Sequence, residues 1–346
     1  MNIDEKEAKL DKSNVIGSIG MIGKQIRQAF DEVSKIEIAK EYMDVKNVVV
    51  CGIGGSALGT DLVKSLFYRT LKVPVEIVND YNLPGYVGKD SMILLSSYSG
   101  GTDETLSCAR QAKKMGLKIV GITSGGELSN FLKENGCPRY VFEPKFNPCK
   151  QPRIGLGYSV FGQIALFARF GFVDIENEEI NDLVEVLERS QEEFKEIAKN
   201  LAEEVCGKVV IYVSGEHLGG NGHILANQTN ENSKQMAFNY LIPEANHHLM
   251  EGLRFPLTNK DDIFFLFLES DLYSDRIKKR FVITKEVVEK NGLKLSSLKR
   301  SNKTRLIEAM TVVSIGSYLT TYLGFVNEVN PAKIPWVDYF KKKLAS

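Results

Sequence analysis

Two short segments of the chain combine glycines with hydroxyl side chains. The first, Gly52-Ile-Gly-Gly-Ser-Ala-Leu-Gly59, follows a β-branched run and opens a helical pattern. A strand, a glycine-rich turn and a helix in this order direct backbone N–H groups and the positive end of the helix at one point. The glycines also allow a phosphate to approach the backbone closely. We therefore expect Gly54, Gly55 and Ser56 to contribute to an anion site.

The second segment follows another apolar run and also opens a helical pattern. It contains six hydroxyls within ten residues, namely Ser96, Ser97, Tyr98, Ser99, Thr102 and Thr105. Capping of the helix by Thr102 alone would explain one of them. Several hydroxyls at a second helix N-terminus fit the several oxygens of a phosphate monoester. The residues expected to hold the phosphate are Ser56, Ser97, Ser99, Thr102 and Thr105, beside Gly54 and Gly55.

Two other interpretations of the first segment remain open at this point. Gly52-x-Gly54-x-x-Ala57 fits a dinucleotide-binding fingerprint, with Asp80 as the acidic partner. A glycine turn with a purely structural role is the other. A dinucleotide-binding domain has no need of the hydroxyl-rich segment, so the two segments together favour a phosphate monoester. A nicotinamide-dependent oxidoreductase stays an alternative.

The elements around these segments alternate between strand and helix, in two series. Such alternation predicts an α/β fold of two αβα sandwiches, each with a mostly parallel sheet covered by helices. The first series has expected strands at 47–51, 75–78, 92–95, 118–122 and 140–142, with helices at 15–43, 57–69, 103–115 and 154–170. The second has expected strands at 208–213, 238–242, 263–268 and 293–297, with helices at 222–235, 275–290, 303–326 and 337–344.

The domain boundaries follow from these series and from a charge-rich helical stretch at 178–204. We expect an N-terminal helical segment at 1–40, a first domain at 41–172, a connecting helix at 173–205 and a second domain at 206–346. A length of 346 residues suits two domains.

Composition narrows the class of protein. Lys and Arg together number 44, as do Asp and Glu, so no global attraction to nucleic acid or to an anionic membrane is expected. The N-terminal stretch is charged, and the apolar runs at 263–268 and 312–323 are too short or interrupted to span a bilayer. We expect a cytoplasmic protein. Five widely spaced cysteines, none in a CxxC pair, predict isolated reduced thiols rather than disulfides or a zinc site.

The two loop segments resemble those of the sugar isomerase (SIS) domain family. From about residue 40 onward the chain resembles the bifunctional phosphoglucose/phosphomannose isomerases of archaea and some bacteria. The segments that carry this likeness are Gln151-Pro-Arg153, Thr229-Asn-Glu-Asn-Ser-Lys234, Pro243-Glu-Ala-Asn-His247 and the region of Lys341. The resemblance implies two SIS domains, a homodimer and no cofactor. It also implies isomerisation of glucose 6-phosphate and mannose 6-phosphate to fructose 6-phosphate.

Aldose–ketose isomerisation moves a proton between C1 and C2 through an enediol, and it needs a base and a group that stabilises negative charge. Glu231 lies between two asparagines whose amides could orient it, although a single Glu is more commonly a surface charge. The resemblance assigns the base to this motif and hence to Glu231. It assigns the charge-stabilising cation to Arg153, which would otherwise be interpreted as part of a surface ion pair.

Ring opening needs groups that exchange protons near neutral pH, such as histidine. The family pattern Asn-His-Asn aligns with Asn246-His247-His248, so His247 matches and His248 is a departure that leaves the choice open. The resemblance implies that His247 reaches the active site of the partner subunit. It also places a ring-opening lysine in the last helix, at the active site. Lys341 gives the best register, and Lys342 is the alternative.

The chain departs from its relatives in two further places. Ile224-Leu-Ala226 stands where relatives often carry Arg-Trp-Lys, and Pro331-Ala332 replaces a common Pro-Thr. The threonine is linked to acceptance of mannose 6-phosphate, so an isomerase restricted to glucose 6-phosphate is an alternative, although Thr320 and Thr321 are nearby in the sequence. A non-catalytic SIS regulator is another. No metal is expected, since His217-x5-His223 and the adjacent His247-His248 lack the spacing of zinc ligands.

Overall fold

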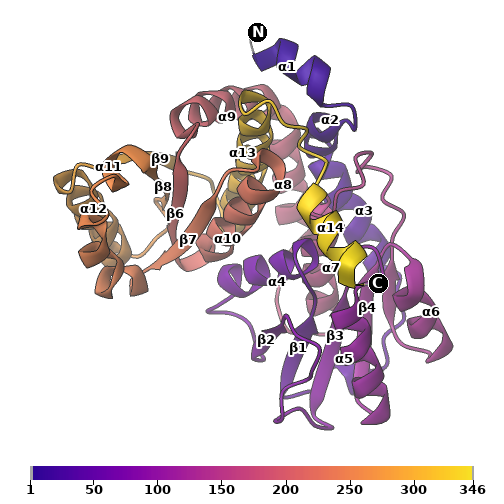
Figure 1. The fold of residues 1–346 in the computed structure, drawn as a ribbon. Coiled ribbons are helices and arrows are strands. Elements are labelled where there is room, and N and C mark those ends of the chain that lie inside the picture. Colours follow the sequence, from indigo (N-terminus) through magenta and orange to yellow (C-terminus); the bar gives the residue numbers. More distant parts are fainter. Residues whose placement is uncertain (1–2, 345–346) are drawn as a thin grey trace. The chain divides into compact units, whose positions relative to one another are not determined.

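The computed structural model describes residues 3–344, which divide into two compact units (Figure 1). One unit is residues 21–188. The other joins the N-terminal segment, through Gly20, to the chain from Arg189 onward. The N-terminal helices are therefore shared between the units and do not form a separate segment.

The unit of residues 21–188 is built on five parallel strands in the order β2-β1-β3-β4-β5. The strands are β1 (Asn47–Cys51), β2 (Val75–Val78), β3 (Ser91–Ser96), β4 (Lys118–Thr123) and β5 (Arg139–Val141). The helices are α3 (Ile22–Ser34), η1 (Lys40–Tyr42), α4 (Gly55–Leu66), α5 (Asp103–Lys114), α6 (Gly126–Glu134), α7 (Leu156–Arg169) and α8 (Asn177–Arg189).

Both faces of this sheet are covered, as a parallel sheet requires. Helices α3, α4 and α7 pack together on one side of the sheet, and α5 and α6 cover the other. The second interface contains a cluster in which Ile93 and Leu95 of β3 meet Leu106 of α5 and Leu132 of α6. The strands β1, β3 and β4 are buried almost throughout, which explains why their apolar runs were visible in the sequence.

The other unit has four parallel strands in the order β7-β6-β8-β9. They are β6 (Val209–Gly215), β7 (Ala237–Ile242), β8 (Ile263–Ser270) and β9 (Lys294–Arg300). The helices are α1 (Ile3–Leu10), α2 (Val15–Gly20), α9 (Gln191–Val205), α10 (Gly219–Gln228), α11 (Asn259–Asp262), α12 (Asp275–Lys290), α13 (Arg305–Val326) and α14 (Pro335–Leu344). Shorter turns are η2 (Glu216–Leu218), η3 (Thr229–Ser233), η4 (Glu244–His247) and η5 (Leu249–Arg254).

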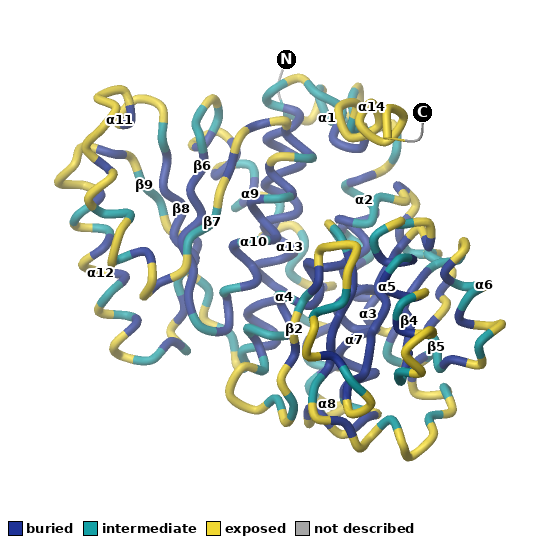
Figure 2. The backbone as a smooth tube through the Cα atoms, turned by 60° about the horizontal axis from the view of Figure 1, so that its bottom comes forward, coloured by how far each residue is buried: buried dark blue, intermediate teal, exposed yellow. Residues whose placement is uncertain are grey.

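Helix α13 is the central helix of this unit (Figure 2). It is the one helix within residues 3–344 that is long and apolar enough to cross a membrane by length and composition, and 94% of its apolar window is buried in the fold. It corresponds to the helix expected at 303–326, and its apolar stretch is longer than the interrupted run at 312–323. Such burial is typical of the core helix of a globular unit.

The expected α/β class, with two parallel sheets covered by helices, is confirmed. The single helix expected at 15–43 is wrong: α2 ends at Gly20 and α3 begins at Ile22. Gly20 lies so close to α9 and α13 that a Cβ atom would come within 2.8 Å of the Gln191 side chain. Helix α6 was not expected, whereas α1 lies within the N-terminal segment that was expected to be helical.

The connecting helix expected at 173–205 is two helices, α8 and α9, separated at Ser190. Each buries its own apolar face, and the division into units falls between them. The expected isolation of the cysteines is also corrected in part. A hydrogen bond from the Cys51 thiol to the Cys108 sulfur, together with burial, raises the pKa of Cys51, and the same bond lowers the pKa of Cys108. Cys51, Cys108, Cys137 and Cys149 are buried free thiols.

Candidate functional site

The two hydroxyl-bearing loops meet at the carboxyl ends of β1 and β3. These strands are neighbours in the sheet, and the chain direction across the sheet reverses between them, which is where ligands bind in open α/β sheets. The Ser56 hydroxyl accepts a hydrogen bond from the backbone N–H of Tyr98 at 2.9 Å. The Ser96 hydroxyl donates to the Ser56 carbonyl at 3.1 Å. The first loop is thereby fixed to the second.

The second loop is folded on its own hydroxyls. Ser97 and Thr102 join their hydroxyls at 2.7 Å, and the N–H of Gly100 donates to the Ser97 hydroxyl at 3.1 Å. Thr102 occupies the N-cap position of α5, yet its side chain makes no cap hydrogen bond. Capping alone therefore does not explain its presence. Gly100 has φ +72°, and a Cβ atom there would lie 1.9 Å from the Gly125 carbonyl, so this turn requires glycine.

The surface of the two loops presents a mixed set of donors. Ser99 and Gly54 are exposed, and Thr102 is half-buried. The first N–H groups of a helix lack intrahelical acceptors, although at the start of α4 those of Ser56 and Ala57 donate to the carbonyls of Ile53 and Gly54. Thr105 differs from the other predicted residues, since its hydroxyl is buried and has no hydrogen-bond partner among residues 3–344. The loops thus offer N–H groups and hydroxyls around one point.

Arg153 is positioned by a network behind the same loops. Its guanidinium donates to the Gln151 side chain at 2.9 Å. Asn147 donates both to the Gln151 carbonyl at 3.0 Å and to the Tyr98 hydroxyl at 2.8 Å. Burial raises the pKa of Tyr98, so its phenol stays protonated at neutral pH. A Cβ atom on Gly55 would lie 3.0 Å from the Arg153 backbone nitrogen, so this glycine permits the approach.

Glu231 lies in η3, a five-residue π turn that follows α10. Such turns are rare and frequently occur at functional sites. The flanking amides fix the backbone of the turn. Asn230 exchanges hydrogen bonds with Ala237 at the start of β7, and Asn232 donates to Thr320 at 3.0 Å. Both amides therefore hold the turn that carries Glu231.

Lys234 connects this turn to the segment that departs from the family pattern. Its ammonium donates to the carbonyls of Glu231 and Asn330, each at 2.8 Å. The Asn330 side chain in turn accepts from the backbone N–H of Ala332 at 2.9 Å. The position that carries alanine instead of threonine therefore belongs to the same bonded assembly as Glu231. Sequence reasoning did not single out Lys234, although it ends the quoted motif.

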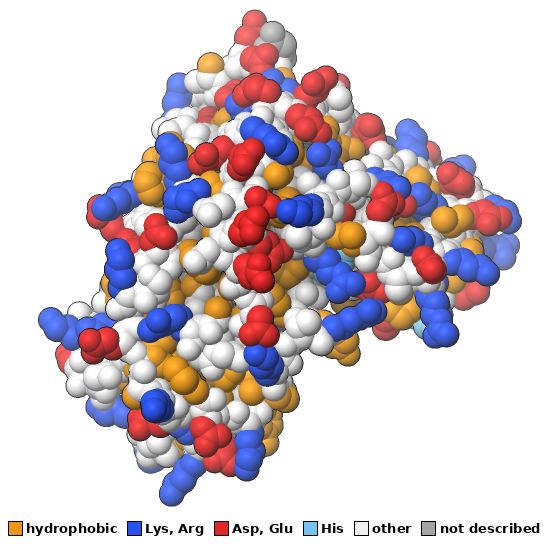
Figure 3. Space-filling view, turned by 180° about the vertical axis from the view of Figure 1, so that it is seen from behind, with side chains coloured by type: hydrophobic (Ala, Val, Ile, Leu, Met, Phe, Trp, Pro, Cys, Tyr) orange, Lys and Arg blue, Asp and Glu red, His pale blue; other side chains and the backbone are white. Residues whose placement is uncertain are grey.

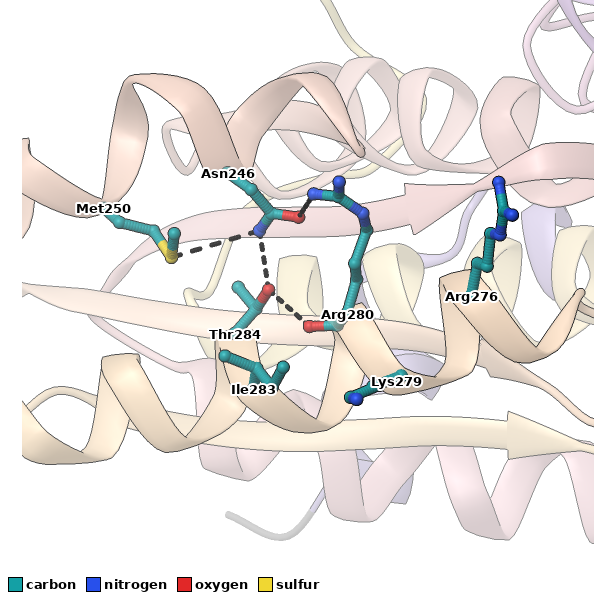
Figure 4. A pocket seen from close by; sticks show the side chains of 7 residues that line it. All are labelled: Asn246, Met250, Arg276, Lys279, Arg280, Ile283 and Thr284. Carbon is teal, nitrogen blue, oxygen red and sulfur yellow. Dashed lines mark hydrogen bonds between the residues drawn. The ribbon is translucent and has the colours of Figure 1, made fainter.

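The two adjacent histidines differ in their surroundings. Both are exposed and follow β7, in and after η4. His248 pairs with Glu244 at 2.8 Å and lies near the Tyr240 ring. Within residues 3–344, the His247 imidazole makes no hydrogen bond or ion pair. Next to it, Asn246 accepts from Arg280 at 3.1 Å and donates to Thr284 at 2.7 Å (Figure 4). His247 is thus the histidine with an unengaged ring on a fixed turn.

Lys341 lies on α14, of which no residue is buried. Lys342 and Lys343 are also exposed, so exposure does not separate Lys341 from Lys342. The same helix exposes Trp336, Tyr339 and Phe340. Among the described residues, no hydrogen bond or ion pair joins Lys341, His247 and Glu231 to one another.

The second sheet has a corresponding strand-end position, between β6 and β8. There the chain supplies its own carboxylates. Glu216, at φ +40°, accepts from the backbone N–H and the hydroxyl of Ser274 at the start of α12. Glu308 of α13 is fully buried, lies 2.7 Å from the His217 ring and accepts from the Ser270 hydroxyl. At this position, carboxylates of the chain itself accept from N–H and hydroxyl donors. Comparable donors line the loops of the first sheet, where a ligand would bind. Sequence reasoning missed Glu308, although an acid in the apolar run of α13 was a signal.

Within the described part of the chain, no three His, Cys, Asp or Glu side chains converge so as to hold a metal ion. On the face shown in Figure 3, acidic and basic side chains are interspersed. This mixing agrees with equal numbers of acidic and basic residues in the sequence.

Comparison with known proteins gives matches along most of the chain. Residues 41–131 match the SIS domain, and residues 194–344 match the bacterial phospho-glucose isomerase C-terminal SIS domain. A bifunctional phosphoglucose/phosphomannose isomerase of Aquifex aeolicus is 31% identical over 310 residues, which cover 89% of this chain and 93% of the relative. One from Caldicellulosiruptor bescii is 29% identical, covering 95% of this chain and 98% of the relative.

Among solved structures, the fold is similar to the C-terminal domain of glucosamine-fructose-6-phosphate aminotransferase from Francisella tularensis. The TM-score is 0.67 at 15% sequence identity, with 92% of this chain and 96% of the other covered. At this identity the likeness concerns the fold alone.

Proposed function

The chain belongs to the family of bifunctional phosphoglucose/phosphomannose isomerases, and on this basis we propose that it interconverts glucose 6-phosphate and mannose 6-phosphate with fructose 6-phosphate by metal-free proton transfer through an enediol. As an aldose–ketose isomerase it needs a phosphate anchor, a base and a cation near the developing charge. The observation that carries the proposal is the hydroxyl- and N–H-lined strand-end site, with Arg153 bound behind it.

In this proposal the phosphate binds at the loops that contain Ser56, Ser97, Ser99 and Thr102. Its binding energy holds the reacting carbons in place, because interactions remote from the reacting atoms serve orientation. The corresponding position in the second sheet is filled by Glu216 and Glu308. The proposal therefore gives each chain one phosphate site of this kind.

Thr102→Val is expected to weaken substrate binding with little loss of turnover at saturation. Valine keeps the shape of threonine but removes the hydroxyl that pairs with Ser97 and would reach the phosphate. A hydrogen bond to a charged group contributes about 1.5–3 kcal/mol, which corresponds to a rise in KM of roughly ten- to a hundredfold. Steady-state kinetics measure KM and kcat separately. Ser107→Ala, on the same helix, is the control, and an unchanged KM for Thr102→Val would exclude this hydroxyl from the anchor.

Glu231 is proposed to remove the proton from one of the two reacting carbons and to return it to the other. Arg153 would stabilise the negative charge on the enediolate oxygen, since a guanidinium remains charged at all relevant pH values. His247 and Lys341 would exchange the protons of ring opening. The chemistry needs no metal or cofactor in this scheme, because charge stabilisation and proton transfer both come from side chains.

The proposal also includes a homodimer in which His247 serves the site of the partner subunit. We expect Glu231→Gln and His247→Ala to be inactive alone but active after the two proteins are mixed and exchange subunits. One site of the mixed dimer then has both native residues, so activity should approach about a quarter of the native value at equal mixing, from one functional site in half of the dimers. Turnover before and after exchange measures this recovery. His248→Ala, whose ring pairs with Glu244, is the control and should stay active. A mixture that remains inactive while mixed dimers are shown to form would place His247 in the site of its own chain.

An isomerase restricted to glucose 6-phosphate is a second candidate, favoured by Ala332. Hydrogen bonds through Asn330 and Lys234 connect this alanine to the turn that carries Glu231. The deciding experiment follows the formation of fructose 6-phosphate from each aldose in the presence of a chelator. Turnover of both supports the bifunctional, metal-free reaction, and turnover of glucose 6-phosphate alone supports the restricted one. Binding of fructose 6-phosphate without any turnover would instead indicate a regulator. We further propose a cytoplasmic location without nucleic-acid or membrane partners.

A further inference from the structure

A hollow of about 440 Å³ lies beside the turn that carries His247. It is formed between α12 and the short helices η4 and η5, all in the unit that begins again at Arg189. Its volume is within the range of small-molecule sites in proteins, roughly 300–1,000 Å³. The lining side chains are those of Asn246, Met250, Arg276, Lys279, Arg280, Ile283 and Thr284 (Figure 4).

The lining contains three cations and no acid. Arg276, Lys279 and Arg280 are spaced i, i+3 and i+4 along α12, so they share one face of the helix, where like charges repel. Neither Arg276 nor Lys279 has an ion pair or a hydrogen bond within residues 3–344. The adjacent acid, Asp275, pairs instead with Lys278 at 3.7 Å. A cluster of this kind is neutralised most directly by a bound anion.

The remaining lining defines the kind of anion. Ile283 and Met250 form an apolar part, and Thr284 and Asn246 contribute a hydroxyl and an amide. In Figure 4, Arg276 and Arg280 extend from α12 towards the side on which Asn246 lies. Guanidinium groups recognise phosphate oxygens in a planar, paired geometry. We propose that this hollow is a second anion site, which binds a small phosphorylated or pyrophosphorylated molecule through Arg276, Lys279 and Arg280.

The hollow differs in chemistry from the loop site at β1 and β3. The loop site offers hydroxyls and backbone N–H groups. The hollow offers side-chain cations, and its affinity should therefore fall steeply with ionic strength. The two sites also belong to different compact units, so each can be removed by substitution without changing the residues of the other.

Hydrogen bonds connect the lining of the hollow to the turn that carries His247. Arg280 donates to the Asn246 side chain at 3.1 Å, Asn246 donates to Thr284 at 2.7 Å, and the Thr284 hydroxyl donates to the Arg280 carbonyl at 2.7 Å. Asn246 immediately precedes His247. An anion that engages Arg280 competes with Asn246 for its guanidinium and so loosens the turn. This coupling, unlike the binding itself, rests on the proposed function of His247.

Calorimetric titration with inorganic pyrophosphate tests the binding. The full chain carrying Ser97→Ala and Thr102→Val, which weaken the loop site, is expected to retain one pyrophosphate site per chain. Adding Arg276→Gln and Lys279→Gln should weaken that site at least tenfold. The control variant carries Lys260→Gln and Lys294→Gln instead, at two exposed lysines outside the lining. These substitutions remove the same amount of charge and should change the affinity for pyrophosphate less than threefold. Circular dichroism of each variant verifies folding.

Two results would overturn the proposal. One is the absence of pyrophosphate binding to the loop variant. The other is equal weakening of binding by the Arg276 and Lys279 substitutions and by the Lys260 and Lys294 substitutions. The coupling is measured by steady-state kinetics of the protein with native loops. Pyrophosphate that competes with the substrate at the loops raises KM, whereas pyrophosphate bound in the hollow should lower kcat. Arg276→Gln with Lys279→Gln should abolish only the effect on kcat. If the protein proved to have no isomerase activity, the calorimetric result would still decide whether the anion site exists.

Discussion

Replacement of Glu231 by glutamine is expected to lower kcat for glucose 6-phosphate by about 10²–10⁴-fold while KM changes less than threefold. General base catalysis contributes a factor of this size. Glutamine has the volume of glutamate, and the hydrogen bonds that Asn230, Asn232 and Lys234 make around η3 use groups other than the Glu231 side chain. Binding and folding should therefore survive, and the loss should appear in the chemical step.

The measurement is a steady-state assay of fructose 6-phosphate formation, together with exchange of the C2 proton of the substrate with solvent. Glu289→Gln, an exposed acid on α12, is the matched control and should retain native turnover. Loss of both turnover and proton exchange supports Glu231 as the base. Native-like exchange in the Glu231→Gln protein would show that another group removes the proton.

Sequence reasoning located strands better than helix boundaries, and the reason is physical. The strand 47–51 was visible because both faces of a parallel sheet are buried, so Asn47-Val-Val-Val-Cys51 is apolar almost throughout. The sequence pattern did not predict the break between α8 and α9 at Ser190. Apolar residues continue in helical register from Leu187 to Phe194, while the two halves pack into different units. The hydrophobic period of a helix shows that one of its faces is buried, but it does not show which core that face packs against.

The candidate site shows the same division. The loop motifs indicated where hydroxyls gather, because such motifs are local. The use of each group was not local: Thr102 pairs with Ser97 instead of capping α5, and Asn232 binds Thr320 from a distant helix. Which partner an amide or hydroxyl selects is decided by tertiary packing, and the sequence around it carries little record of that choice.

Glu308→Ala is expected to be the most destabilising single substitution considered for this chain. Glu308 has no exposed surface, and its carboxylate binds the His217 ring and the Ser270 hydroxyl in the core between β6, β8 and α13. Removal of the carboxylate leaves the His217 ring and the Ser270 hydroxyl buried without this partner, and each unsatisfied buried polar group costs about 1–3 kcal/mol. For a unit of this size the combined loss lowers the Tm by roughly 4–24 °C. Differential scanning calorimetry measures it.

The physical cause can be separated from simple loss of volume. Glu308→Gln keeps the shape and a hydrogen-bonding group but not the charge, so it should lose less stability than Glu308→Ala. Formate added to the Glu308→Ala protein should recover part of the Tm, since it restores a carboxylate opposite His217 and Ser270, and it should leave the native Tm unchanged. Glu286→Ala, which removes an exposed pair with Lys290, should shift stability by less than about 1 kcal/mol.

A small Tm change in Glu308→Ala, or equal losses in the Ala and Gln variants without any formate effect, would mean that the carboxylate is not the anion around which this strand-end position is built. Recovery by formate would instead show that the second sheet retains the chemistry of an anion site and satisfies it internally, which leaves the loops of the first sheet to the substrate.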